Sequence, residues 1–358
     1  MSGLMYRPDM DEVRERLRVW WEGGEIGRPF LRLTAPREEP LEEIPALPRP
    51  EGWLTHYSTM DFEYRVNNDI RRCVNQHYLA DAVPTVHPCM GPNSLALYLG
   101  CTAVEAPGTV WFEPCIDNPD DFEFAYDPDN FYWDFTLRLT RALHDEGTGK
   151  FLFDFPDLIE GLDTLGAMRG TEKLLVDLIE RPDWVHRSLR RITDLYFHYY
   201  DILYDLMRDE VGGSHFWAWA PGRVAKLQCD ISAMISPDMF AEFMVPVLRE
   251  MCERLSYTIY HWDGPGALPH LDHLLSIPDL DVIQWTPGAG IEGCAHRRWW
   301  PLYHRILEAG KAVFVGVGSL ESLKAMRQEF GEELNRFLVV MRADSLEEAE
   351  DVLRTVSS

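Results

Sequence analysis

Short apolar runs, rich in β-branched and aromatic residues, recur along the chain, and longer helical patterns separate them. Such runs predict buried strands. Eight of them are found, at residues 29–35, 82–87, 150–155, 223–230, 257–263, 280–286, 311–317 and 336–342. Strands that alternate with helices in this number favour an α/β fold, a (β/α)8 TIM barrel with N-terminal additions. An open doubly wound sheet is the alternative, but the glycine-rich phosphate turn typical of that fold is missing.

The clearest helical pattern covers residues 236–255. Ser236 is a favourable N-cap, and Pro237 fits the first turn. Apolar side chains then repeat at helical spacing, at Met239, Phe240, Phe243, Met244, Val247, Leu248 and Met251. Pro246 lies within this pattern and predicts a kink, because proline cannot donate the backbone hydrogen bond of a helix interior.

The whole chain is expected to form one domain with an extension. Residues 25–358 are assigned to a single barrel and residues 1–24 to an N-terminal helical extension. The segment Pro36–Gly52 is rich in proline and glutamate and is expected to be an exposed arm. The N-terminus lacks a secretory pattern and no apolar run could cross a bilayer, so a cytoplasmic location is expected.

The run Tyr257–Asp263 begins apolar, ends in His-Trp-Asp and stops at Gly264. Side chains alternate along a strand, so His261 and Asp263 share one face. Barrel enzymes carry their catalytic groups at the C-terminal ends of strands. We therefore predict that His261 and Asp263 project together into the barrel mouth and serve chemistry rather than folding.

Polar residues also end other predicted strands. On the fourth strand Lys226, Gln228 and Asp230 share a face, and Asp230 is either a catalytic carboxylate or a solvated cap. Gln228 is a substrate-binding candidate, and further candidates at strand ends are His87, Asp154 and Arg342.

Four tryptophans lie at or near predicted strand ends: Trp217, Trp219, Trp262 and Trp285. Together they predict an aromatic substrate pocket, suited to a cationic or methylated ligand through cation–π contacts or to a flat macrocycle. Strict alternation from His261 would instead turn Trp262 outward, into the core.

A metal site is one hypothesis for the paired residues on this strand. Imidazole and carboxylate both ligate zinc at about 2.0–2.2 Å, so His261 and Asp263 could hold zinc or another divalent ion. A third ligand is needed, and Asp230, His87 and Cys294 are the candidates. The alternative is a neutral His261 oriented by Asp263, an arrangement that suits general acid–base catalysis.

The net charge and the cysteine content argue against several kinds of binding partner and structural site. The formal net charge of −25 opposes binding to nucleic acid or to an anionic membrane. The seven cysteines are odd in number and none lies in a CxxC spacing, which argues against a disulfide framework and a zinc ribbon. Small-molecule substrates are expected, and the protein could form a homodimer.

Several segments resemble the uroporphyrinogen decarboxylase superfamily. They are "ISPDMFAEFMVPVLREM" at 235–251, "YTIYHWDG" at 257–264, "DVIQW" at 281–285, "GKAVFVGVGSLESL" at 310–323 and "GRPFLRLTAP" at 27–36. The resemblance implies a (β/α)8 barrel and either tetrapyrrole decarboxylation or zinc-dependent methyl transfer to corrinoid proteins or thiols. The methyltransferases carry His-x-Cys at the end of strand five and another Cys near strand eight. Here His261 matches, Asp263 replaces the Cys, and the last strand has no Cys.

Three functions follow from this resemblance. The first is methyl transfer with a corrinoid partner protein, in which His261 and Asp263 hold a metal and Asp230 is a third ligand or general base. The second is decarboxylation of a tetrapyrrole without a cofactor, in which Asp230 or Asp263 faces the pyrrole nitrogens. The third is binding of a tetrapyrrole or a methylated amine without turnover.

Overall fold

The computed structural model describes residues 3–104 and 109–357. Its centre is a seven-stranded sheet in the order β11-β12-β13-β14-β15-β1-β4. All neighbours are parallel except β4, which is antiparallel to β1. The strands of this sheet are β1 (Phe30–Pro36), β4 (Gln76–Ala80), β11 (Val224–Gln228), β12 (Tyr257–Asp263), β13 (Val282–Thr286), β14 (Ala312–Gly316) and β15 (Phe337–Arg342).

Shorter strands continue the curve of the sheet. β5 (Thr85–Val86) pairs in parallel with β8 (Leu152–Phe153), and Asp154 bridges in parallel to His215 of β9 (Ser214–Phe216). β9 forms a hairpin with β10 (Ala218–Ala220), which the hydrophobic pattern did not predict. Two further small hairpins are β2 (Trp53–Thr55) with β3 (Ser58–Thr59) and β6 (Thr102–Val104) with β7 (Trp111–Glu113).

All eight predicted strands are present, and the α/β class is confirmed. Closure of the barrel by hydrogen bonds is not found: in the described ranges no ladder joins β1 to β5, or β9 to β11. The reason at the first of these places is that β4 occupies the edge of β1 that a closing strand would need.

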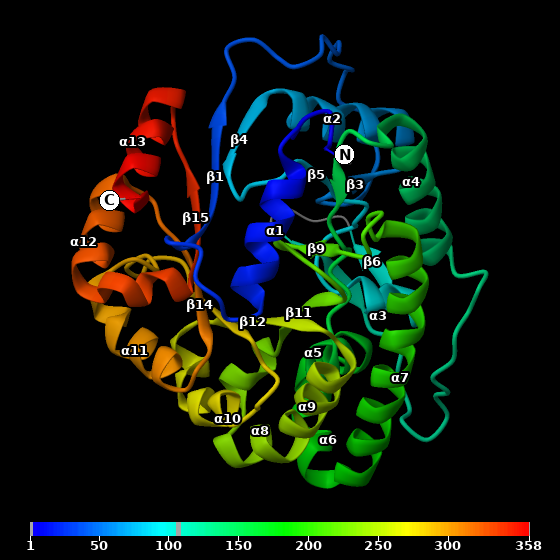
Figure 1. The fold of residues 1–358 in the computed structure, drawn as a ribbon. Helices are drawn as coiled ribbons and strands as arrows, with labels where there is room; N and C mark the ends of the chain where they lie inside the picture. Colours follow the sequence, from blue (N-terminus) through cyan, green and yellow to red (C-terminus); the bar gives the residue numbers. More distant parts are fainter. Residues whose placement is uncertain (1–2, 105–108, 358) are drawn as a thin grey trace.

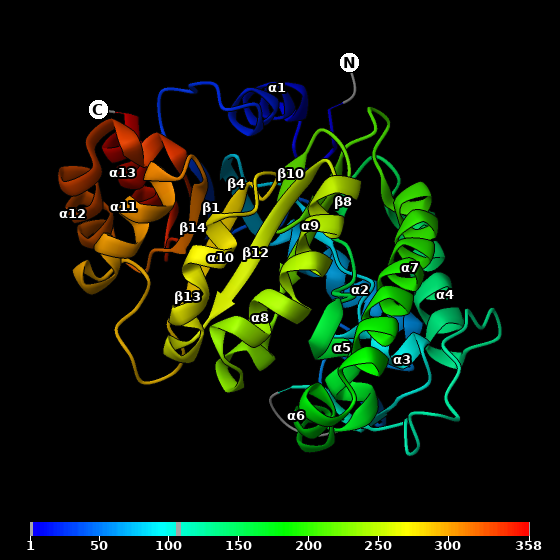
Figure 2. The same cartoon turned by 90° about the horizontal axis from the view of Figure 1, so that it is seen from below.

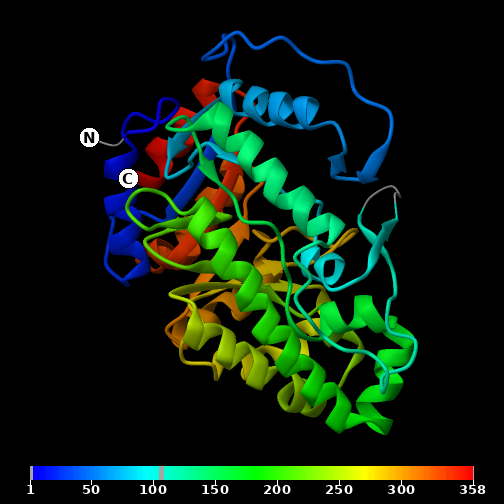
Figure 3. The same cartoon turned by 90° about the vertical axis from the view of Figure 1, so that its right-hand side faces the viewer.

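Helices lie outside the strands and connect them (Figures 1 and 2). They are α1 (Met10–Trp21), α2 (Phe62–Val74), α3 (Ser94–Tyr98), α4 (Phe131–Gly147), α5 (Gly161–Arg169), α6 (Thr171–Glu180), α7 (Pro182–Met207), α8 (Pro237–Phe243), α9 (Val245–Arg254), α10 (Leu271–Leu275), α11 (Trp300–Glu308), α12 (Leu320–Phe330) and α13 (Leu346–Ser357). Figure 3 shows α4 and α7 covering one side, where His144 on α4 bonds the carbonyl of Leu206 at 2.7 Å. Among the residues described, none of these helices has the length and apolar character that crossing a membrane requires.

The helix predicted at 236–255 is interrupted as expected. The Ser236 hydroxyl accepts a hydrogen bond from the Met239 backbone N–H at 3.2 Å and caps α8. Pro246 stands in the first turn of α9, where a missing N–H costs nothing, so the chain ends α8 at Phe243 and starts α9 at Val245.

α1 covers the N-terminal ends of the strands, away from His261. Trp21 contacts Tyr257, the first residue of β12, with 5.0 Å between ring centroids, and its indole N–H donates to the Trp219 carbonyl at 2.8 Å. Trp219 is 3% exposed, and its own N–H donates to Asp209 at 2.8 Å. The Asp209 carboxylate also forms a salt bridge with the guanidinium of Arg14 on α1, at 3.0 Å. Trp219 is therefore not placed beside His261 as predicted: its indole fastens α1 to the body of the protein.

Replacing Trp219 by Phe should lower the free energy of unfolding by about 1.5–3 kcal/mol, the usual value of a hydrogen bond to a charged group. Trp285→Phe is the matched control, because the Trp285 indole N–H is buried without a partner among the described residues. Denaturant unfolding of both variants measures the difference. An equal loss in the two variants would show that packing, and not the bond to Asp209, accounts for the effect.

Candidate functional site

The C-terminal ends of β11, β12 and β13 bring three polar residues into register. Gln228 lies opposite His261, and His261 lies opposite Gln284. Since register partners in a parallel sheet point to the same face, these side chains lie side by side. Asp263 follows His261 on that face, and Asp230 comes just after β11.

Asp230, His261 and Asp263 converge, as predicted for the catalytic and metal-binding residues. One ligand atom from each lies within 4.8 Å of the others, and Asp230 is the most exposed of the three. His261 Nε2 is 3.9 Å from Asp263 Oδ2, too long for a hydrogen bond. Two atoms at that separation can nevertheless contact one ion, since each metal bond is about 2.0–2.2 Å.

Gln284, not Asp263, orients the imidazole of His261. His261 Nδ1 contacts the Gln284 side-chain oxygen. Because that oxygen can only accept, Nδ1 carries the proton and Nε2 keeps its lone pair toward the carboxylates. Burial and the nearby Lys226 lower the pKa of His261, so the ring is neutral and able to ligate a metal at neutral pH.

The segment from the end of β8 into the first turn of α5 supplies carboxylates at every third position: Asp154, Asp157, Glu160 and Asp163. Each one binds a neighbouring strand or the residues that directly follow it. Asp154 binds His215 of β9 at 2.8 Å, and Asp157 binds the buried ammonium of Lys226 on β11 at 2.7 Å. The segment thus runs along β11 and places its carboxylates beside the polar face of that strand.

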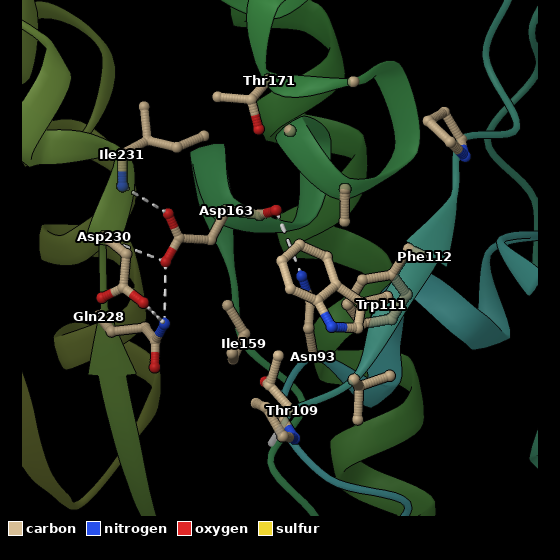
Figure 4. A pocket seen from close by; sticks show the side chains of 16 residues that line it. Asn93, Thr109, Trp111, Phe112, Ile159, Asp163, Thr171, Gln228, Asp230 and Ile231 are labelled. Carbon is tan, nitrogen blue, oxygen red and sulfur yellow. Dashed lines mark hydrogen bonds between the residues drawn. The ribbon is translucent and has the colours of Figure 1, made fainter. Parts of the chain in front are cut away.

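Asp163 fixes the position of Asp230 (Figure 4). One Asp163 oxygen accepts from the Asp230 backbone N–H at 2.8 Å and from the Gln228 amide at 2.9 Å. The other accepts from the Ile231 N–H at 3.0 Å. The Gln228 amide also donates to the Asp230 carboxylate at 3.2 Å. In this structure Gln228 therefore positions Asp230.

Burial, with a smaller contribution from neighbouring carboxylates, raises the pKa values of Asp230 and Glu160. Burial, and then the charge of Asp163, raise the pKa of Asp230 to about 7, although its carboxylate still reaches solvent. Glu160 is fully buried, and burial raises its pKa to about 8, even though it accepts the Gln228 backbone N–H at 2.8 Å. For Asp154 burial is outweighed by His215, and its pKa falls to about 2.

Trp217 is the predicted tryptophan that reaches the site. Its ring lies edge-on to His261 with 5.7 Å between centroids and also contacts Phe314 at 5.6 Å. Its backbone adopts a φ of 58°, which is uncommon outside glycine, and its N–H donates to Asp154 at 3.2 Å.

Trp262 and Trp285 are buried and do not reach the site, so the predicted placement of both rings in the pocket beside His261 is wrong. They pack on each other with 4.7 Å between centroids, and Trp285 also contacts Trp299. Alternation is the reason: Trp262 follows the inward His261 and therefore points to the helices, and Trp285 is its register partner.

Two other predicted residues, His87 and Arg342, lie at the ends of other strands. His87 follows β5, where its Nε2 contacts the Phe155 carbonyl at 2.7 Å. Arg342 is exposed at the end of β15, opposite Thr34 of β1. Neither contacts the Asp230, His261 and Asp263 group in the described residues.

A cavity of about 400 Å³ adjoins the carboxylates (Figure 4). Gln228, Asp230 and Asp163 form its polar side, and Trp111 and Phe112 of β7 face them. The cavity can therefore hold a small molecule with a polar group toward Asp230 and an apolar part toward β7.

Sequence reasoning did not find Asp163, Glu160 or Gln284. The run of carboxylates that begins at the end of a predicted strand, from Asp154 to Asp163, was a usable signal, because barrel enzymes carry functional groups at strand ends. For Gln284, the signal was its position on the neighbouring strand β13, where it is the register partner of His261.

Glu160→Gln should flatten the pH dependence of stability. The folded pKa of Glu160 is about 8 against 4.5 for the free group, so its stabilising contribution is full below about pH 4.5 and is lost as pH rises to about 8. The variant keeps the acceptor for the Gln228 N–H and cannot ionise. Its advantage over wild type should grow between about pH 5 and pH 9, by up to about 1.4 kcal/mol for each unit separating the two pKa values.

Denaturant unfolding at several pH values measures this difference. Glu253→Gln, at an exposed glutamate, is the control and should follow wild type. A constant gap between Glu160→Gln and wild type across this range would contradict a buried, neutral Glu160.

No family model matches this chain, and no curated protein matches it either. Among solved structures, a methyltransferase from Methanosarcina mazei superposes with a TM-score of 0.59 at 12% sequence identity. The match covers 96% of this chain and 97% of that chain. At this identity the likeness shows the fold, and the chain therefore shares its fold with a methyltransferase along nearly its whole length.

Proposed function

We propose that this protein is an enzyme that transfers a methyl group at the mouth of a barrel, with a divalent metal held by Asp230, His261 and Asp263. One observation carries the proposal: donor atoms of these three residues lie within 4.8 Å of one another at the C-terminal ends of parallel strands. The fold that the chain shares with a methyltransferase supports the type of reaction.

We further propose that residues 25–358 form a (β/α)8-type barrel and that the chain is a divergent member of the uroporphyrinogen decarboxylase superfamily. Support comes from the eight predicted strands, all present, and from the shared fold. The methyl donor would be a methylated corrinoid carried by a partner protein.

The residues present fit a borderline or hard divalent ion such as zinc. Two carboxylates and one neutral imidazole are a common donor set, and the absence of a thiolate in the group disfavours soft ions. The bond from His261 Nδ1 to Gln284 is the outer contact that metal-binding histidines usually make.

When bound, such an ion would polarise the acceptor group and ease the loss of its proton. Asp230 would supply the third donor atom to such an ion or, as the most exposed carboxylate of the group, would instead accept that proton as a general base. The acceptor atom then forms its bond to the methyl carbon as the bond from carbon to the donor breaks, and the donor leaves with the electron pair. The adjoining cavity would hold the rest of the acceptor.

Asp230→Asn, His261→Gln and Asp263→Asn should each weaken zinc binding beyond the about 10–100-fold that loss of an outer contact causes. The measurement is titration of the chelator-treated protein with zinc, with the rise in melting temperature as a second readout. Asp238→Asn, at an exposed aspartate outside the group, should bind like wild type. Wild type that binds no zinc, cobalt or manganese would overturn the metal site.

Methyl transfer itself is tested with methylcobalamin as donor and small thiols or alcohols as acceptors. Wild type with zinc should demethylate methylcobalamin, and the three ligand variants should not. Carbon dioxide release from a tetrapyrrole by metal-free protein would instead support decarboxylation. Binding of a tetrapyrrole or methylated amine without any turnover would support the non-catalytic alternative.

Gln284→Ala should lower zinc affinity by about 10–100-fold while leaving all three ligands in place. The reason is that the amide oxygen holds the proton on His261 Nδ1 and the lone pair on Nε2. Gln284→Glu retains an acceptor at the same place and should bind zinc at least as well as wild type. Equal affinity of the alanine variant and wild type would show that His261 is oriented by something else.

A further inference from the structure

Cys89 lies beside His87 at the end of β5, a place that the proposed metal group does not use. Cys89 Sγ is 3.4 Å from His87 Nδ1, within the range of a hydrogen bond to sulfur. Only Pro88 separates the two residues, and the Cys89 N–H donates to the His87 carbonyl at 2.8 Å. The backbone therefore holds the thiol against the ring.

A second contact fixes which nitrogen of His87 carries the proton. His87 Nε2 is 2.7 Å from the Phe155 carbonyl oxygen. A carbonyl can only accept, so Nε2 is the donor, and in the neutral ring Nδ1 is an acceptor. That acceptor faces Cys89 Sγ, which makes His87 a base aimed at the thiol.

Charged and titratable groups on neighbouring elements surround this pair. Arg65 of α2 donates to the His87 carbonyl at 2.9 Å and lowers the pKa of Cys89. Asp154, after β8, raises the pKa of His87; Asp154 is itself bound by His215 and influenced by Arg32 of β1. Burial raises the pKa of Tyr98 on α3, and the charge of Cys89 raises it further.

His87 and Cys89 shift each other's pKa in opposite directions. Burial lowers the pKa of His87, but Cys89 and the other neighbours outweigh it and bring it to about 9. Burial raises the pKa of Cys89, but His87 outweighs it and the net shift is downward. A thiolate beside an imidazolium is the arrangement that both shifts favour.

The other cysteines have different surroundings. Cys73 donates to the Thr85 carbonyl, Cys252 to the Thr258 hydroxyl, and Cys294 to the Trp285 carbonyl. Cys101 and Cys115 contact each other at 3.8 Å. In the described part of the chain, Cys89 is the one thiol with an imidazole in hydrogen-bond contact.

We propose that Cys89 is a nucleophilic site, activated by His87, for a soft electrophile whose reacting carbon carries a leaving group. This role goes beyond metal-assisted methyl transfer and stands independently of it. The thiol proton passes to His87 Nδ1, sulfur attacks the carbon, and the carbon–sulfur bond forms as the bond to the leaving group breaks. The leaving group departs with the electron pair, and the imidazolium then gives its proton to water.

Alkylation of the native full-length protein with iodoacetamide tests the site, because this reagent is small and Cys89 is 8% exposed. Each cysteine is followed by peptide mass spectrometry after a brief exposure. Between about pH 8.5 and pH 6 an ordinary thiol slows by more than about a hundredfold, since only its thiolate reacts. Cys89 should slow by less than about tenfold over the same range.

His87→Gln should restore the steep pH dependence at Cys89 and reduce its rate at neutral pH by at least about tenfold. His198→Gln, at an exposed histidine that contacts tyrosine rings, should not change it. If His87→Gln does not fold, the wild-type profile decides alone, with Cys252 and Cys294 as internal comparisons. A Cys89 that stays unlabelled, that shows the ordinary steep profile, or that reacts alike with and without His87 would overturn the proposal.

Discussion

Lys226 is the cation around which the candidate site is organised. Its ammonium, 1% exposed, binds Asp157 and the side-chain oxygen of Gln228. Gln228 then directs its amide to Asp163 and Asp230. Carboxylates gathered this closely repel one another and lose hydration, and a buried unpaired charge is costly. A single buried ammonium thus allows the acidic segment to pack on β11 while Asp230 still faces solvent.

The sequence predicted the strands and the inward residues of β12 because both follow from local rules. A period of two places His261 and Asp263 on one face, and the same rule turns Trp262 away. The incorrect grouping of Trp262 and Trp285 with the pocket came from setting nearness to a strand end above this alternation. For the fold, β4 was missed because its partner strand, β1, lies far away in the chain.

The residues that hold the site could not be read from local pattern. Asp163 acts through the backbone of Asp230, which is 67 positions away. Glu160 and Gln284 likewise act across elements, on β11 and β12. Such contacts are set by how β8, α5 and β11 pack, and a single sequence gives no direct measure of that packing. Behind the site, the Trp262 indole N–H donates to the Ala267 carbonyl and secures the end of β12.

The positive φ of Trp217 lowers the stability of the fold but holds the indole beside the candidate site. A φ of 58° costs a tryptophan roughly 1–3 kcal/mol that glycine would not incur. The ring that bears this cost packs on His261 and Phe314. Selection for thermal robustness alone would therefore drift toward glycine here, and selection for turnover would hold the indole. A library that varies this one position and is sorted separately for folding and for catalysis would separate into two populations.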